Sequence, residues 1–279
     1  SRASGGSWRA NRSFLKQTLG PSFPKEAYPN PNKLMNALAG TLIFFLCGFA
    51  FSSFGAKDGK PNIIVFLVDD YDKPETSPYG GKVLTPNLDR LAKEGMLCHN
   101  AHVTSTVCTP SRYTFLTGRY ASSSHSKTFL AQCPEGTQAL PAFNVGLESD
   151  RMNVGKVLAD AGYATGFVGK YHVHDMDHGQ EDSLFGDLEV PKNVEYSEEL
   201  NRRKFKLEKL QRQLIRKNGF TWARNVYWGN LKSPFKGHNP DWTTKAALEF
   251  IEEHKDEPFY LHCCSTLLHG PNGEWFKSL

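Results

Sequence analysis

The segment Cys108–Arg112, which reads Cys-Thr-Pro-Ser-Arg, combines residues that suit nucleophilic chemistry on an anion. Thr109-Pro110 predicts the start of a helix, with threonine as the N-cap and proline at the first helical position. Cys108 would then lie just before the helix, where free backbone N–H groups favour an anion and activate a thiol for modification or attack. Arg112 lies one turn further on and can reach the same anion with its fork of donors.

A buried structural cysteine is the alternative explanation for Cys108. Arg112 and the following Leu-Thr-Gly-Arg sequence, Leu116–Arg119, argue against it, because a packing role requires neither. We therefore interpret this segment as part of a reactive site.

Three apolar runs predict strands that are buried in a parallel sheet: Ile63–Val68, Tyr163–Val168 and Phe259–Cys263. Polar side chains follow each run: Asp69, Asp70, Lys170, His172 and His269. Open α/β sheets place their sites beyond the carboxyl ends of the strands. We therefore expect these five side chains to converge on one edge of the sheet.

Asp69 and Asp70 suit a hard divalent cation, because adjacent carboxylates repel each other unless a positive charge lies between them. The alternative is an ordinary turn at the end of the strand, in which one carboxylate caps the next helix. Taken alone, an acidic pair in a loop favours that alternative.

Helical patterns alternate with the strands, over residues 85–95, 109–118, 154–161, 201–217 and 241–253. This order predicts an α/β domain with a mainly parallel sheet. Two of the helices show apolar stripes that we expect to face inward: Leu88, Leu91 and Ala92 on the first, and Leu207, Leu210 and Leu214 on the fourth. The fourth helix is also strongly basic, which indicates either a solvated face or a wall that attracts an anionic substrate.

Cys108–Arg112, followed by Leu116–Arg119, resembles the signature of the sulfatases, a family within the alkaline phosphatase superfamily. The similarity runs from about Pro61 to the end of the chain, with four motifs in the family's order. It implies an alkaline-phosphatase-like sandwich with a central, mainly parallel β-sheet flanked by helices. It also implies that a formylglycine-generating enzyme oxidises Cys108 to formylglycine, whose hydrate is the nucleophile.

The resemblance also assigns roles to the other polar residues. Asp69, Asp70 and the modified Cys108 correspond to ligands of a divalent metal, usually calcium, with magnesium as a possible substitute. Lys170 and His172, in Gly-Lys-Tyr-His, match the pair that contacts the sulfate and the nucleophile. His269, in His-Gly-Pro, matches a histidine that faces the ester oxygen. Arg112 would orient the nucleophile beside the metal.

The chain departs from the family after His269. The family completes its metal site with an Asp-Asn or Asp-His pair, then adds a second substrate lysine and a C-terminal subdomain. None of these follows His269 in the sequence. We therefore expect residues 57–279 to be the N-terminal part of a sulfatase catalytic domain, with the C-terminal part missing.

The N-terminal residues predict export. Residues 1–34 contain six basic residues and one acidic residue, and their composition predicts a disordered or upstream non-native segment. Residues 35–56 include an uncharged apolar run that suits a signal peptide, with a retained membrane anchor as the alternative. We expect a periplasmic, extracellular, secretory or lysosomal protein that meets the membrane only through this segment. Cysteines of an exported protein can form disulfides.

Charge excludes one class of partner. The whole chain carries a net charge of +4, but residues 35–279 hold 27 basic and 28 acidic residues. A nearly neutral body gives no electrostatic argument for nucleic acid.

The expected function is therefore that of an arylsulfatase-like sulfuric ester hydrolase acting on a sulfated small molecule or glycan. Two alternatives stay open. One is a phosphodiesterase or phosphonate monoester hydrolase that uses the same modified cysteine, because sulfate and phosphate esters share a tetrahedral shape. The other is an inactive truncated domain that binds sulfated glycans through the basic helix.

Overall fold

The computed structural model describes residues 59–175, 195–229 and 240–269, which belong to one compact unit. The predicted leader segments, residues 1–34 and 35–56, lie outside the described residues. Within the described part of the chain, no helix combines the length and the apolar character needed to cross a membrane.

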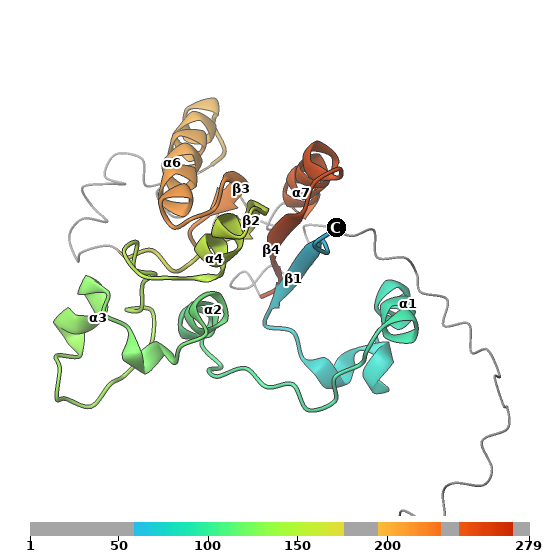
Figure 1. The fold of residues 1–279 in the computed structure, drawn as a ribbon, viewed down its shortest axis with the longest axis horizontal. Coiled ribbons are helices and arrows are strands. Elements are labelled where there is room, and N and C mark those ends of the chain that lie inside the picture. The colour runs from blue at the N-terminus through green and yellow to red at the C-terminus, as the bar shows by residue number, and fades with distance from the viewer. Residues whose placement is uncertain (1–58, 176–194, 230–239, 270–279) are drawn as a thin grey trace, which may run out of the picture. The chain divides into compact units, whose positions relative to one another are not determined.

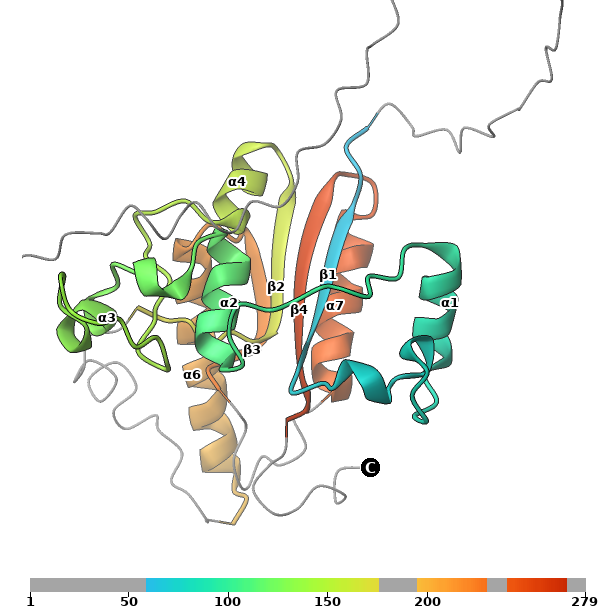
Figure 2. The same ribbon diagram turned by 90° about the horizontal axis from the view of Figure 1, so that it is seen from below.

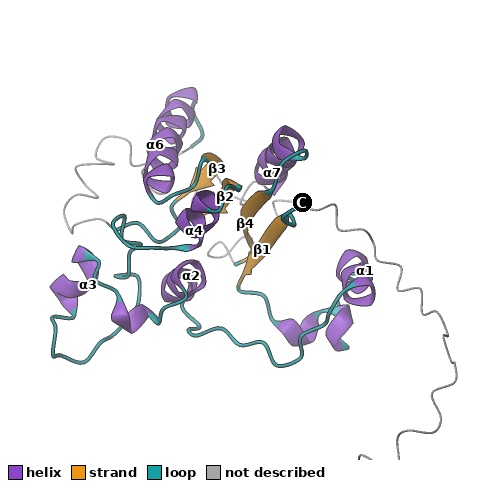
Figure 3. Ribbon diagram, viewed as in Figure 1, coloured by secondary structure: helices purple, strands orange, loops and turns teal. Residues whose placement is uncertain are grey.

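A four-stranded parallel sheet forms the centre of this unit, in the order β1-β4-β2-β3 (Figures 1 and 3). Its strands are β1 (Ile63–Asp69), β2 (Ala164–Lys170), β3 (Trp222–Tyr227) and β4 (Phe259–Leu268). The predicted α/β class, the parallel sheet and three of the strands are confirmed. The fourth strand, β3, has no counterpart in the sequence prediction.

Six α-helices occur in the described residues: α1 (Pro86–Glu94), α2 (Cys108–Thr117), α3 (Lys127–Gln132), α4 (Val154–Asp160), α6 (Glu198–Lys217) and α7 (Pro240–His254). Tyr113 and Leu116 of α2 belong to a buried cluster on one face of the sheet. Phe250 of α7 belongs to a second cluster, on the other face. The sheet is therefore a central layer with helices on both sides, as Figure 2 shows for α2 and α7.

The apolar stripe predicted for α1 does not face inward. Leu88 and Leu91 are 39% and 59% exposed, and no residue of α1 is buried. The main partner of α1 is a 3-10 turn, Ser77–Tyr79, which it meets through polar groups. Ser77 Oγ donates to Asp89 Oδ2 over 2.9 Å, and its backbone N–H donates to Thr85 Oγ1 over 3.2 Å. The helix start at Thr85 and Pro86 is as predicted.

The leucine stripe predicted for α6, Leu207, Leu210 and Leu214, is only half-buried. The fully buried residues of α6 are Leu200, Glu208, Gln211 and Ile215, two of which are polar. The two polar residues are buried because they hydrogen-bond β3, an edge strand whose outer N–H and C=O groups have no neighbouring strand. Glu208 Oε1 accepts from Val226 N over 3.3 Å. Gln211, with its amide turned to suit both partners, bonds the carbonyl of Val226 at 3.1 Å and the N–H of Trp228 at 3.2 Å.

The sheet is irregular where its strands end. The register shifts between Val68 and Asp69 on β1, and between Val168 and Gly169 on β2. Gly169 has φ +88°, and a Cβ at this position would lie 2.0 Å from the carbonyl oxygen of Cys264 on β4. Glycine at 169 therefore lets β2 turn tightly against β4 just before Lys170.

Replacing Gly169 with alanine should lower the free energy of unfolding by about 3 kcal/mol or more, since a strained φ and an unrelieved backbone clash add together. Gly80→Ala is the matched control. Gly80 has φ +85° but no atom within 4 Å of the place a Cβ would occupy, so only the conformational cost of about 1 kcal/mol should appear. Urea-induced unfolding of both variants measures the difference, and equal losses would disprove the close-approach explanation.

Candidate active site

A buried carboxylate with two cationic partners lies at the carboxyl end of β1. Asp69 is 6% exposed. Its Oδ2 accepts a hydrogen bond from the ammonium group of Lys170 and lies 3.6 Å from the guanidinium of Arg112. Burial alone would raise the pKa of Asp69, but the positive charges of Arg112 and Lys170 outweigh it and lower that pKa. Asp69 is therefore an anion that both cations share.

Arg112 joins α2 to the end of β2. It is 4% exposed, and its Nη1 donates to the backbone carbonyl of Lys170 over 2.9 Å. Its buried Nε has no hydrogen-bond partner among the described residues. Two buried cations, Arg112 and Lys170, thus lie beside the carboxylate of Asp69. Buried positive charge of this kind is the electrostatic property that an anion site needs.

Cys108 lies beside His172, with 3.3 Å between its Sγ and the Nδ1 of the imidazole. The helix starts two residues earlier than predicted: Cys108 is its first residue and Val107 is the N-cap. The thiol is therefore inside the first turn of α2 and not before it. The free N–H groups of that turn still surround it.

His172 is held in an unusual state. Its backbone φ is +54°, a value that residues other than glycine rarely adopt, so the surrounding structure must enforce it. Burial lowers its pKa to about 3, assisted by the charges of Lys170 and Arg112. The imidazole is therefore neutral at neutral pH and able to accept a proton.

Asp70 and His269 form a second pair at the same edge. Asp70 has φ +52° and a side chain that is 57% exposed, and its Oδ2 lies 3.5 Å from His269 Nε2. The charge of His269 also lowers the pKa values of Asp69 and His172, so the two groups are close enough to interact. The structure thus brings all the predicted site residues to one edge of the sheet, with Asp69 buried and Asp70 facing solvent.

The described residues do not build a complete metal site. Among them, no three or more His, Cys, Asp or Glu side chains are arranged to hold an ion. Asp69 is engaged by Lys170, and Asp70 turns towards His269. Calcium takes about six to eight oxygen ligands. The predicted calcium or magnesium site therefore needs ligands beyond the described part of the chain.

Glu148 is a positioning residue that the sequence prediction missed. It is 3% exposed and accepts hydrogen bonds from the hydroxyl of Tyr113 (3.1 Å) and the N–H of His125 (2.7 Å). The guanidinium of Arg119 lies 3.9 Å from it. Glu148 thereby anchors the C-terminal half of α2. Nothing in the local sequence marks it, because its partners come from distant parts of the chain.

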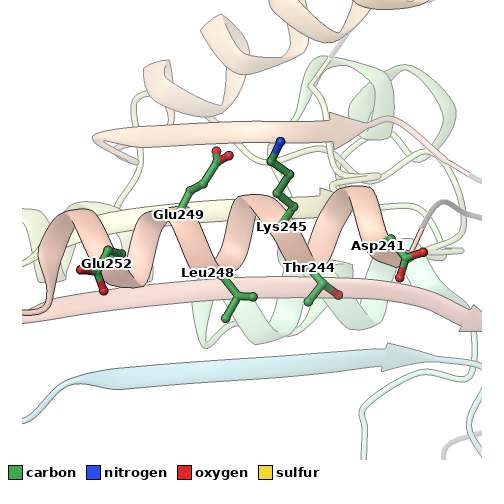
Figure 4. Close-up of a pocket in the computed structure, with 6 residues that line it drawn as sticks. All are labelled: Asp241, Thr244, Lys245, Leu248, Glu249 and Glu252. Atoms are coloured by element: carbon green, nitrogen blue, oxygen red, sulfur yellow. The ribbon is translucent and has the colours of Figure 1, made fainter.

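A shallow pocket elsewhere is lined only by side chains of α7: Asp241, Thr244, Lys245, Leu248, Glu249 and Glu252 (Figure 4). None of the site residues lines it. Its position on the outer surface of a helix gives it no part in the chemistry at the sheet edge.

Comparison with known proteins fits this arrangement. The family model described as Sulfatase matches residues 61–277, which is most of the chain. The chain belongs to the sulfatase family. Human steryl-sulfatase is 35% identical over 146 residues, covering 50% of this chain and 24% of that protein. An N-acetylgalactosamine-6-O-sulfatase of Bacteroides thetaiotaomicron is 38% identical over 120 residues, covering 43% and 22%.

Comparison with solved structures also finds a sulfatase of similar fold. A solved sulfatase described with the metabolism of multiple glycosaminoglycans by Bacteroides thetaiotaomicron superposes with a TM-score of 0.51 and 22% identity, covering 76% of this chain and 52% of that one. This likeness confirms the alkaline-phosphatase-like fold. The sequence matches cover only about a quarter of the length of the human and bacterial sulfatases named above.

A buried histidine beneath the site gives this sulfatase chain a testable pH dependence. His262 of β4 is 1% exposed, and its Nδ1 lies 2.7 Å from the hydroxyl of Tyr260. Burial lowers its pKa to about 3, with a contribution from the charge of Arg112. An unfolded histidine has a pKa near 6.5. Below about pH 6.5 the unfolded state therefore binds a proton that the folded state does not bind. The free energy of unfolding falls as the pH is lowered.

His262→Gln should remove one proton from this linkage, so that the loss of unfolding free energy between pH 6 and pH 4 becomes smaller by about 1.4 kcal/mol per pH unit. Urea unfolding across this pH range measures the slope. His102→Gln, which replaces an exposed histidine, is the matched control and should keep the wild-type slope. Identical slopes for both variants would show that His262 is not held neutral.

Proposed function

We propose that this chain carries the nucleophile and the anion-binding half of a sulfuric ester hydrolase. The observation that supports this most is the pair of buried cations, Arg112 and Lys170, that lies around Asp69 close to the Cys108–His172 pair. A sulfate ester brings one negative charge and a tetrahedral group with several acceptor oxygens. The free donor of Arg112 and the ammonium of Lys170 suit such a group.

The proposed nucleophile is formylglycine, formed from Cys108 by a formylglycine-generating enzyme. One hydroxyl of its hydrate loses its proton to solvent and attacks sulfur, and the ester oxygen leaves with a proton for which His269 is the proposed donor. His172 then takes the proton from the second hydroxyl, so that the carbon–oxygen bond to sulfate breaks and the aldehyde returns. An unmodified serine or cysteine has no second hydroxyl and would stop at the sulfated intermediate.

The charges of the site support the proposed role of His172. Its pKa of about 3 keeps it neutral, which a proton acceptor requires. The same value makes it a weak base while Lys170 and Arg112 dominate its surroundings. A bound sulfate offsets those positive charges and would raise the pKa of His172 towards neutrality. The base would therefore strengthen when substrate is present.

A divalent cation belongs to the proposal through Asp69 and Asp70, whose carboxylates would be two of its ligands. Because the described residues do not complete its coordination, the steps above are assigned to protein side chains alone. Export of the protein, through residues 35–56, is likewise part of the proposal.

Production of the chain in a host that contains a formylglycine-generating enzyme tests this proposal. We expect mass spectrometry to show formylglycine at position 108, and an aryl sulfate to be hydrolysed in preference to an aryl phosphate diester when calcium is supplied. Cys108→Ala should abolish turnover, a loss of at least about 1,000-fold, because it removes the nucleophile.

Cys108→Ser distinguishes the hydrate mechanism from simple nucleophilic attack, since it should release the alcohol once and then stop. Three results would contradict the proposal. An unmodified thiol in that host would favour a domain that only binds sulfated glycans. Faster turnover of the diester would favour a phosphodiesterase. Full activity of Cys108→Ala would exclude this residue.

A further inference from the structure

Phe143 is an exposed aromatic residue that contacts the catalytic histidine. Its ring centroid lies 5.6 Å from that of His172, with 33° between the ring planes, and its side chain is 63% exposed. Trp228 contacts the same imidazole edge-on, at 5.1 Å. His172 in turn contacts Cys108, so Phe143 is one side chain removed from the proposed nucleophile.

Hydrogen bonds hold the loop that carries Phe143, residues 140–147, in place. Asn144 is 7% exposed, and its Oδ1 accepts from Ala142 N over 2.7 Å while its Nδ2 donates to Leu140 O over 3.3 Å. A further hydrogen bond, from Leu147 N to Val173 O at 2.7 Å, ties the loop's continuation to the segment that carries His172. The backbone that carries Phe143 is therefore tied both to itself and to the segment that carries His172.

The loop presents apolar surface at the site. Its sequence from Leu140 to Phe143 is Leu-Pro-Ala-Phe, which has no charged or hydrogen-bonding side chain. Leu140 is 65% exposed, similar to Phe143. Exposed leucine and phenylalanine side chains lose the stabilisation that burial of their apolar surface would give. An apolar residue held in this way beside charged side chains suits a ligand with an anionic end and an apolar end.

We propose that Phe143 forms the wall that receives the alcohol part of the substrate, and that this part is a flat apolar ring. The sulfate would lie among Arg112, Lys170 and Cys108, and the ring would stack on Phe143. Sugar rings need hydrogen-bond partners for their hydroxyl groups, which this loop does not offer. The inference rests on the proposed sulfate ester hydrolysis and adds the class of substrate, an aryl or fused-ring sulfate.

Kinetics of Phe143→Ala with two substrates test the wall. For a fused-ring aryl sulfate we expect KM to rise about five- to tenfold, the effect of losing one aromatic contact, while kcat changes less than about twofold. For a hexosamine 6-sulfate both constants should stay at wild-type values. Phe143→Tyr keeps the ring face and should restore the aryl KM. Phe205→Ala, which removes a 52% exposed phenylalanine from α6, is the matched control and should change neither substrate.

A different result would overturn the inference. If Phe143 served only to shield His172, Phe143→Ala would lower kcat for both substrates and shift the pH profile of both. Unchanged constants for the aryl sulfate would equally exclude the wall.

Equilibrium binding separates this inference from the proposed function. An aromatic sulfonate carries the anion and the ring but no ester to cleave, so its affinity is measurable by calorimetry even if wild type hydrolyses nothing. Binding that weakens about five- to tenfold in Phe143→Ala, with no change for methanesulfonate, would support the wall. Equal affinity in wild type and Phe143→Ala would refute it. Absence of turnover in wild type would count against the proposed hydrolysis alone.

Discussion

The site depends on one buried carboxylate that is shared by two cations. Asp69 ends β1, Lys170 ends β2, and Arg112 comes from α2, so their contacts join three elements at a single point. Buried ion pairs add little net stability, because desolvation offsets most of the attraction, but removing one member is costly. The cluster therefore specifies an arrangement more than it stabilises the fold. Its two buried cations lie close to Cys108, where the proposed sulfate group would bind.

Local strain in the backbone aims these side chains. Asp70 and His172 have positive φ, Gly169 approaches β4 too closely for any side chain, and both register shifts of the sheet fall beside these residues. At these ends Asp69 is buried beside Lys170, Asp70 is exposed beside His269, and His172 lies against the thiol of Cys108. Strain concentrated at one edge is typical of functional sites, where the surrounding core enforces it.

Much of this arrangement followed from the sequence. β1, β2 and β4 are continuous apolar runs, and the rule that parallel strands end at a common edge was enough to gather residues from Asp69 to His269. β3 was missed because Arg224 and Asn225 interrupt its apolar pattern. The buried face of α6 and the anchoring role of Glu148 were missed for another reason: both depend on partners that only the tertiary structure supplies. Roles at the level of single atoms, including the metal, stay predictions.

A double-mutant cycle on Asp69 and Lys170 tests the shared carboxylate most directly. Asp69→Asn should cost about 3 kcal/mol or more of unfolding free energy, because it removes the carboxylate that both buried cations face. Lys170→Met should cost less, because Arg112 still lies beside Asp69. The double variant should cost less than the sum of the two by about 1–3 kcal/mol, since loss of the carboxylate matters less once one of its two cations is gone. Strict additivity in urea unfolding would show that the two side chains do not interact, and would contradict the central role of the shared carboxylate.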